Sequence, residues 1–208
     1  MHPRWAYNGR MELNQVNAKL DALHRTEQQG DYAETARLYD ELLTFLAGVK
    51  RAGGADVDQT LRSLAFNSAH FRNKHFHDYT RALQAVELGM ACSPTDFGVS
   101  VGLAAKGEAL WGLGRKEEAM QAFRAAAEAH PINGRIESAY CMVRLEDPEL
   151  LPIAAAWVES AVKNYSQHFN DHPDWIRQVS AVRAAAAAQP APAGKPKASF
   201  LDRLLGKK

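Results

Sequence analysis

Residues 100–131 read SVGLAAKGEALWGLGRKEEAMQAFRAAAEAHP, and this stretch decides the fold class. Gly107 stands in the middle of an apolar helical pattern. Glycine costs ~1 kcal/mol there relative to alanine, so we expect a close contact with a neighbouring helix to compensate. Gly114 ends this first helix, the charged run 115–118 begins a second, and Pro131 ends the second. The stretch therefore predicts a hairpin of two antiparallel helices.

The second helix carries a face of alternating small and large side chains. Ala119, Phe123 and Ala126 follow at spacings of four and three, which lets two helices approach while an aromatic ring fills the gap. Together with Gly107 and Gly114, this order of residue types resembles the tetratricopeptide repeat. The resemblance implies a stack of helical hairpins, each closed by a tight turn.

Weaker copies of the same pattern occur upstream. His77 stands where the second copy should have its turn glycine, and Thr35 stands where the first copy should have an alanine. The copies are offset by 37 and 47 residues, whereas repeats of the family span ~34. We therefore expect longer helices or loops around residues 46–58.

Apolar spacings of three and four predict helices along most of the chain, and no alternating β-strand pattern is present. The predicted fold is all-α, an antiparallel helical-hairpin repeat array over residues 12–188. A last helix containing Trp175 is expected to cap the array. Residues 1–11 are expected to be a flexible N-terminus, and residues 189–199 a linker of proline, alanine and lysine.

The final segment, residues 200–208, is predicted to be a short amphipathic basic tail. Its apolar side chains fall on one face of a helical turn and a half, and they are Phe200, Leu201, Leu204 and Leu205. From Lys195 onward, five basic side chains accompany one acidic side chain. The tail is suited to docking on a partner protein, to weak contact with an anionic membrane, or to folding back on its own groove. A disordered soluble end is the remaining alternative.

Composition restricts the function classes. The chain has 208 residues, 46% hydrophobic and 24% charged, which suffices for a packed core, and its net charge of +1 favours no nucleic acid. Two cysteines make no disulfide framework. The start lacks the apolar region of a secretory signal, and no apolar run reaches ~18 residues. We expect a cytoplasmic protein, with peripheral membrane association through the tail as an option.

The sequence contains few residue patterns typical of a metal site or a catalytic site. His70, His75 and His77 are the best metal-ligand candidates, but no carboxylate or thiolate stands at ligand spacing, so we predict no metal site and no cofactor. Cys92 and Cys141 have no nearby histidine or CxxC partner, and no nucleophile elbow or phosphate loop occurs. The protein is therefore not expected to be an enzyme.

The repeat resemblance implies a concave groove lined by the first helix of each hairpin. Carrying the register over, the groove residues are Leu64, Asn67, Phe71, Lys74, Val101, Ala104, Glu108 and Trp111. Leu64 and Val101 fit a core position equally well. Phe71 and Trp111 are the expected anchors, because aromatic residues are enriched at binding hot spots.

The function expected from these features is a non-catalytic adaptor, scaffold or chaperone-like module. It would bind a peptide or helix of a partner protein in its concave groove. The alternative is a peripheral membrane-associated assembly factor tethered by the basic tail. The sequence leaves the oligomeric state open.

Overall fold

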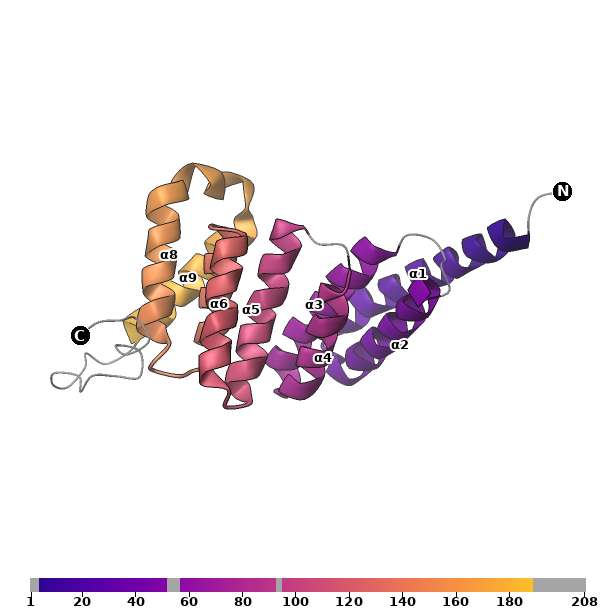
Figure 1. Ribbon diagram of the computed structural model, residues 1–208, viewed down its shortest axis with the longest axis horizontal. Helices are drawn as coiled ribbons and strands as arrows, with labels where there is room; N and C mark the ends of the chain where they lie inside the picture. The colour runs from indigo at the N-terminus through magenta and orange to yellow at the C-terminus, as the bar shows by residue number, and fades with distance from the viewer. Residues whose placement is uncertain (1–3, 52–56, 93–94, 189–208) are drawn as a thin grey trace.

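The computed structural model describes residues 4–51, 57–92 and 95–188, and all regular structure in these ranges is helical, which confirms the predicted all-α class. The elements are α1 (Arg4–Gln29), α2 (Tyr32–Arg51), α3 (Asp58–Phe76), α4 (Tyr79–Met90), α5 (Asp96–Gly112), α6 (Lys116–Ala129), α7 (Asn133–Arg144), α8 (Leu151–Tyr165), the 3₁₀ helix η1 (Ser166–Asp171) and α9 (Pro173–Ala188). Figure 1 shows an elongated molecule with α1 and α2 at one end and α8 and α9 at the other.

Helix α1 is longer than the sequence predicts. Helix α1 begins at Arg4, so residues 4–11 are helical where the sequence predicts a flexible N-terminus. Helices α2 and α3, between the first two turns, are 20 and 19 residues long, whereas α4 and α5, between the next two turns, are 12 and 17 residues long, so the longer upstream offset reflects longer helices. The predicted linker, 189–199, and tail, 200–208, lie outside the described residues.

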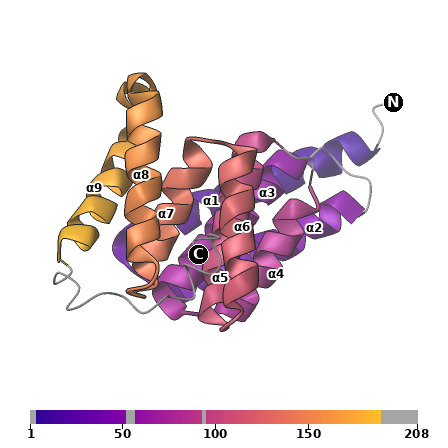
Figure 2. The same ribbon diagram turned by 60° about the vertical axis from the view of Figure 1, so that its left-hand side comes forward.

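The odd-numbered helices form a row that the even-numbered helices cover. Along this row, α3 contacts α5, α5 contacts α7, and α7 contacts α9. Helices α2, α4, α6 and α8 each contact the two odd-numbered helices that flank them in sequence. Figure 2 shows α7 beside α6 and α8.

Helix α5 lies at the centre of the core. Its Ala105 and Ala109 are buried with residues of α1–α4, whereas Ala104, Leu110 and Trp111 are buried with residues of α6–α9. A helix that is apolar on several faces has to be enclosed on several faces. The packing of α3, α4, α6 and α7 around α5 meets that requirement.

Gly107 and Gly134 permit close helix contacts around this core. A Cβ atom at Gly107 would lie 2.6 Å from the ring of Phe123, so the expected close contact in the 100–131 hairpin is present. A Cβ atom at Gly134 would lie 1.8 Å from the backbone oxygen of Ala126. The backbones of α6 and α7 can therefore meet only if residue 134 has no side chain.

The turns between paired helices share one backbone conformation. Gly30, His77, Gly114 and Glu146 have φ values of 73°, 51°, 77° and 52°. His77 and Glu146 thus adopt the left-handed region that favours glycine. His77 does take the place of the turn glycine, as its position in the sequence predicts.

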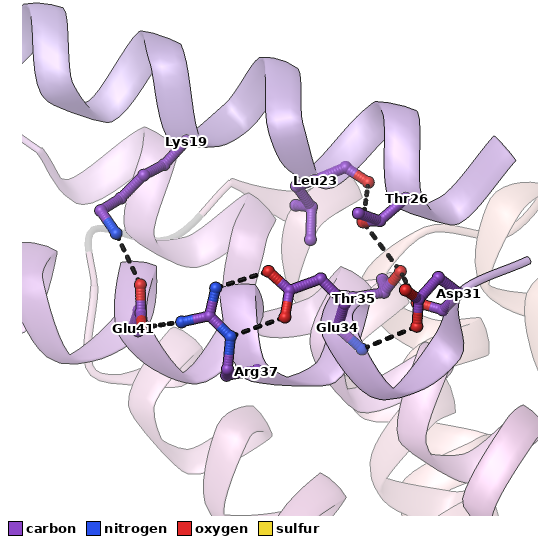
Figure 3. A network of polar contacts seen from close by, with 8 residues as sticks. All are labelled: Lys19, Leu23, Thr26, Asp31, Glu34, Thr35, Arg37 and Glu41. Atoms are coloured by element: carbon purple, nitrogen blue, oxygen red, sulfur yellow. Dashed lines mark hydrogen bonds and ion pairs between the residues drawn. The ribbon is translucent and has the colours of Figure 1, made fainter. Parts of the chain in front are cut away.

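In the first hairpin, Thr35 stands where the repeat pattern has an alanine, and it makes polar contacts there. Thr35 is fully buried; its hydroxyl donates to the Asp31 backbone oxygen at 2.7 Å and lies 3.0 Å from the Thr26 hydroxyl. The Asp31 side chain accepts a hydrogen bond from the Glu34 backbone and so caps α2. Figure 3 shows these contacts joining α1 to α2. Lys19 adds an ion pair to Glu41 at 2.5 Å.

A buried hydrogen-bond chain sets the position of α9. Asn133 donates to the Ser100 hydroxyl at 3.0 Å and accepts from the Trp175 indole at 2.9 Å. Asn133 and Ser100 are almost completely buried. Because unpaired buried polar groups are costly, this chain fixes α5, α7 and α9 relative to one another.

Candidate functional site

A cleft of about 770 Å³ lies among the described residues. Its lining comes mainly from α3, α7 and α9, with Glu27 of α1 and Tyr39 of α2. Six of the lining side chains are charged, five carry an aromatic or imidazole ring, and two are amides. Such a mixture suits recognition of a polar chain with apolar anchors better than enclosure of a purely apolar ligand.

The predicted groove residues of α3 divide between the cleft and the core. Asn67, Phe71 and Lys74 line the cleft. Leu64 is 5% exposed and belongs to the core formed by α1–α5. The core alternative for Leu64 is therefore the one that the structure shows.

The predicted groove residues of α5 do not line the cleft. Ala104 is fully buried and Trp111 is 6% exposed, both among residues of α6–α9, and Val101 packs partly buried on the other core cluster. Trp111 donates through its indole nitrogen to Asp147 at 3.1 Å, in the turn between α7 and α8. The repeat register places these side chains in a groove, but packing of α3 and α7 on α5 covers them.

Glu108, the fourth predicted residue of α5, is 2% exposed and lies in a buried ion pair. Arg144 Nε donates to its Oε1 at 2.8 Å, and Arg144 Nη2 donates to its Oε2. Asn73 Nδ2 donates to Oε2 at 3.1 Å. A buried carboxylate needs such compensation, and here α3 and α7 supply it.

His70 and Cys141 complete this polar cluster. Arg144 Nη2 lies 3.2 Å from His70 Nδ1 and 3.4 Å from Cys141 Sγ. Because a guanidinium only donates, His70 Nδ1 accepts and the imidazole proton resides on Nε2. Burial and the charge of Arg144 lower the pKa of His70 to about 3. Burial also raises the pKa of the Cys141 thiol, so this sulfur is a poor nucleophile.

The same cluster has the composition of a metal site. Ligand atoms of His70, Glu108 and Cys141 lie within 4.8 Å of one another. The guanidinium of Arg144, however, contacts all three residues and supplies the positive charge that a metal ion would bring. These residues therefore fit an arginine-centred cluster better than a metal ion.

The three histidines singled out in the sequence have separate surroundings. The His75 ring lies 4.1 Å from that of Tyr32. His77 Nδ1 is 3.0 Å from the Tyr79 hydroxyl at the turn between α3 and α4. Only His70 belongs to the group of possible metal ligands in the described part of the chain.

An aromatic cluster adjoins the cleft. Phe71 is at its centre, with ring centroids 5.9 Å from Tyr32, 5.5 Å from Tyr39, 4.9 Å from His75 and 5.9 Å from Phe76. Tyr32 and Phe76 remain 43% and 44% exposed. We call these five residues the aromatic cluster. It offers exposed ring surface beside the polar wall of the cleft.

The wall formed by α7 and α9 was not foreseen from the sequence. Tyr140 and Arg144 are four residues apart on α7, and the guanidinium stacks over the Tyr140 ring at 4.9 Å. Gln178 of α9 donates to Glu137 of α7 at 2.7 Å. The spacing of Tyr140 and Arg144 is a signal that could have placed both on one face of α7.

Comparison with protein-family models, with curated proteins and with solved structures finds no match to this chain. Among the helices described, none is both long enough and apolar enough to cross a bilayer. The tail residues predicted for docking, Phe200, Leu201, Leu204 and Leu205, lie outside the described residues.

Proposed function

We propose that this protein is a non-catalytic interaction module, a helical-hairpin repeat array of the tetratricopeptide type, that binds a peptide or helix of a partner protein. The observation that carries the proposal is the cleft lined by α3, α7 and α9, with exposed aromatic rings of Tyr32 and Phe76 beside it. Aromatic side chains at the edge of a polar cleft are suited to anchoring a bound segment.

The repeat assignment is supported by equivalent positions in three hairpins. Gly30, His77 and Gly114 share a positive φ at the turn. Five residues later, Thr35, Ala82 and Ala119 are all fully buried. Four residues further on, the larger side chains Tyr39, Val86 and Phe123 are also buried. The hairpins thus use the same positions for the same packing.

A binding role is also favoured by the state of the reactive side chains. His70 and Cys141 are two of the groups at or near the cleft that could perform acid–base or nucleophilic chemistry. Both contact Arg144, and their pKa values are displaced away from the neutral range that such chemistry uses. A scaffold or adaptor acting in the cytoplasm is the role we assign.

The test is a peptide-display selection on the full-length protein, using a library of random peptides. Recovered peptides are synthesised and titrated against the Tyr32→Ala/Phe76→Ala variant, with Phe97→Ala/Met90→Ala as the matched control. The control side chains Phe97 and Met90 are also exposed, at 50% and 39%, but they neither line the cleft nor belong to the aromatic cluster beside it.

We expect the Tyr32/Phe76 variant to bind at least about tenfold more weakly, and the control to bind like the wild type, since each tenfold corresponds to ~1.4 kcal/mol. Melting curves check that both variants are folded. Peptides that bind both variants equally well would remove the cleft from the proposal.

A further inference from the structure

A second hollow, of about 480 Å³, lies between α2 and α4, with buried residues of α3 at its base. None of the residues that line it also lines the cleft. Each of the three helices contributes one arginine to its lining, Arg51 from α2, Arg72 from α3 and Arg81 from α4. We call this hollow the arginine groove. It is separate from the surface to which the proposed function belongs.

The charges around the arginine groove are unequal. Asp40 is the one acidic residue among the described residues that line it. Asp78 does not line the groove, but its carboxylate lies 3.5 Å from Arg72 and 3.7 Å from Arg81. Three arginines against these two aspartates leave one positive charge in excess. The groove is therefore positive even when the ion pairs of its arginines are counted.

Arg51 carries the excess charge. Its Nε donates to the Ala47 backbone oxygen at 3.2 Å. The ion pairs that the described residues form around the groove involve Lys50, Arg72 and Arg81, but not Arg51. A guanidinium has five N–H donors, and this side chain is exposed. Arg51 therefore has donors available for a bound anion.

Arg72 is held in place at the base of the groove. It is 3% exposed, and its Nη2 and Nη1 lie 2.5 Å from Asp40 and 3.5 Å from Asp78. Two carboxylates from different parts of the chain thus fix its guanidinium. A fixed arginine presents its donors as a rigid fork, which is the geometry that recognises oxygen anions.

Ser68 adds a buried hydroxyl that has no partner. The residue is fully buried and lines the groove, and its Oγ makes no hydrogen bond within the part of the chain that the structure describes. Ser68 stands four residues before Arg72, so both lie on the same face of α3. A buried polar group without a partner is costly, and a ligand oxygen in the groove would remove that cost.

The groove also has an apolar part. Leu43 and Ala47 of α2 face Ala85 and Leu88 of α4 across it. Ligand sites commonly combine apolar lining with a few polar groups that fix the orientation of the ligand. An anion that carries an apolar substituent fits this combination better than a bare ion.

We propose that the arginine groove binds a phosphate monoester, whose oxygens accept hydrogen bonds from Arg51, Arg72 and Arg81. The Ser68 hydroxyl donates to the same group, and the substituent of the ester packs beside Leu88. A phosphate monoester carries close to two negative charges and three acceptor oxygens, which suits a site built from several arginines. This inference does not rest on the proposed function of the cleft.

The experiment titrates the full-length protein with phenyl phosphate by calorimetry, at about 0.15 M salt so that general charge attraction is screened. Phenol is the neutral control ligand. Arg51→Gln/Arg81→Gln is the principal variant, because both side chains are exposed. Arg25→Gln/Arg37→Gln is the matched control, because it loses the same two charges from exposed positions outside the groove.

We expect phenyl phosphate, but not phenol, to bind the wild type and the control variant. Binding to Arg51→Gln/Arg81→Gln should be at least about tenfold weaker. Asp40→Asn should bind more tightly than the wild type, because it removes the acid that competes for Arg72, and a damaged fold would not give that gain.

Ser68→Ala provides a second readout. It should weaken binding of phenyl phosphate without lowering the melting temperature, because the hydroxyl that it removes has no partner in the free protein. A serine with a purely structural role would instead lower the melting temperature and leave the affinity unchanged.

Phosphatidylcholine vesicles with and without phosphatidic acid distinguish the source of the phosphate. Sedimentation that requires both phosphatidic acid and the two exposed arginines would assign the phosphate to a lipid head group. Titration by phenyl phosphate alone would assign it to a soluble ligand. Absence of binding to either probe, or binding that Arg51→Gln/Arg81→Gln shares with the wild type, would overturn the proposal and leave the peptide test of the cleft unaffected.

Discussion

Arg144 of α7 and Glu108 of α5 form a bidentate ion pair beneath the cleft, with Nε 2.8 Å from Oε1 and Nη2 bonded to Oε2. The two residues are 36 positions apart in sequence. Glu108 is 2% exposed, so its charge has no access to water. The pair therefore connects α5 and α7 in the core to the geometry of the cleft.

Breaking this pair should destabilise the protein strongly. Arg144→Met leaves Glu108 charged and buried, and we expect the free energy of unfolding to fall by about 3–5 kcal/mol. Replacing both residues, as Glu108→Leu/Arg144→Met, should recover most of that loss because no buried charge remains. Urea unfolding followed by circular dichroism measures both.

A surface ion pair provides the control for this measurement. Arg183 and Glu159 are 51% and 57% exposed and 2.7 Å apart. Arg183→Met should cost at most about 1 kcal/mol, since exposed pairs are screened by water. Equal losses for Arg144→Met and Arg183→Met would contradict the importance of burial.

Two glycine-to-alanine substitutions should have opposite effects. At Gly134 the added Cβ would lie 1.8 Å from the Ala126 backbone oxygen, so α6 and α7 would have to separate. We expect Gly134→Ala to lower the free energy of unfolding by about 1–3 kcal/mol or more, as overpacked cores do. At Gly48, inside α2, nothing lies within 4 Å of the new atom.

Gly48→Ala should therefore stabilise the protein by up to about 1 kcal/mol, through the better helix propensity of alanine. Thermal melts of the two variants beside the wild type test the pair. A Gly134→Ala variant that melts with the wild type would show that the α6–α7 approach is looser than described.

The local part of the fold could be predicted from sequence, and the site only in part. Hairpin 100–131 depends on helix periodicity and on Gly114, which are local signals, and its two helices are present as expected. Phe71 and Lys74 could be placed because the register of α3 is regular. Arg144 and Gln178 reach the cleft from helices whose packing no local pattern encodes.

The position of Trp111 in the repeat register does not determine whether its ring is exposed or buried. An exposed aromatic on a groove helix and a buried one have the same sequence pattern. Two contacts keep the Trp111 ring buried. Asp147, in the α7–α8 turn, accepts the indole hydrogen bond, and the Lys116 ammonium lies 4.6 Å from the ring centroid. The ring is consequently part of the core, and it cannot anchor a partner.

The turn position 77 should tolerate glycine better than histidine. His77 has φ 51°, a conformation that costs most non-glycine residues about 1–2 kcal/mol. His77→Gly should raise the free energy of unfolding by roughly 1 kcal/mol, less the contribution of the contact between His77 and Tyr79. His77→Ala loses the same contact and keeps the strain, so it should be less stable than His77→Gly. Chemical denaturation of the three proteins checks this order.

Protonation of His70 should link stability to pH. In the unfolded chain an imidazole takes up its proton near pH 6.5, whereas burial and Arg144 lower the pKa of His70 to about 3 in the folded chain. Between these values the unfolded state binds the extra proton, so the stabilisation present above pH 6.5 is lost progressively as the pH falls toward 3. The limiting slope for one such group is about 1.4 kcal/mol per pH unit.

His70→Gln isolates this contribution, because the glutamine oxygen can still accept from Arg144 but does not titrate. We expect the free energy of unfolding of the variant to fall less steeply than that of the wild type between about pH 6.5 and pH 4, where the histidine titrates in the unfolded chain. Other titrating groups are common to both proteins and cancel in the difference. Parallel pH dependences would mean that His70 accepts its proton in the folded state as readily as in the unfolded one, and hence that the Arg144 contact does not hold its ring neutral.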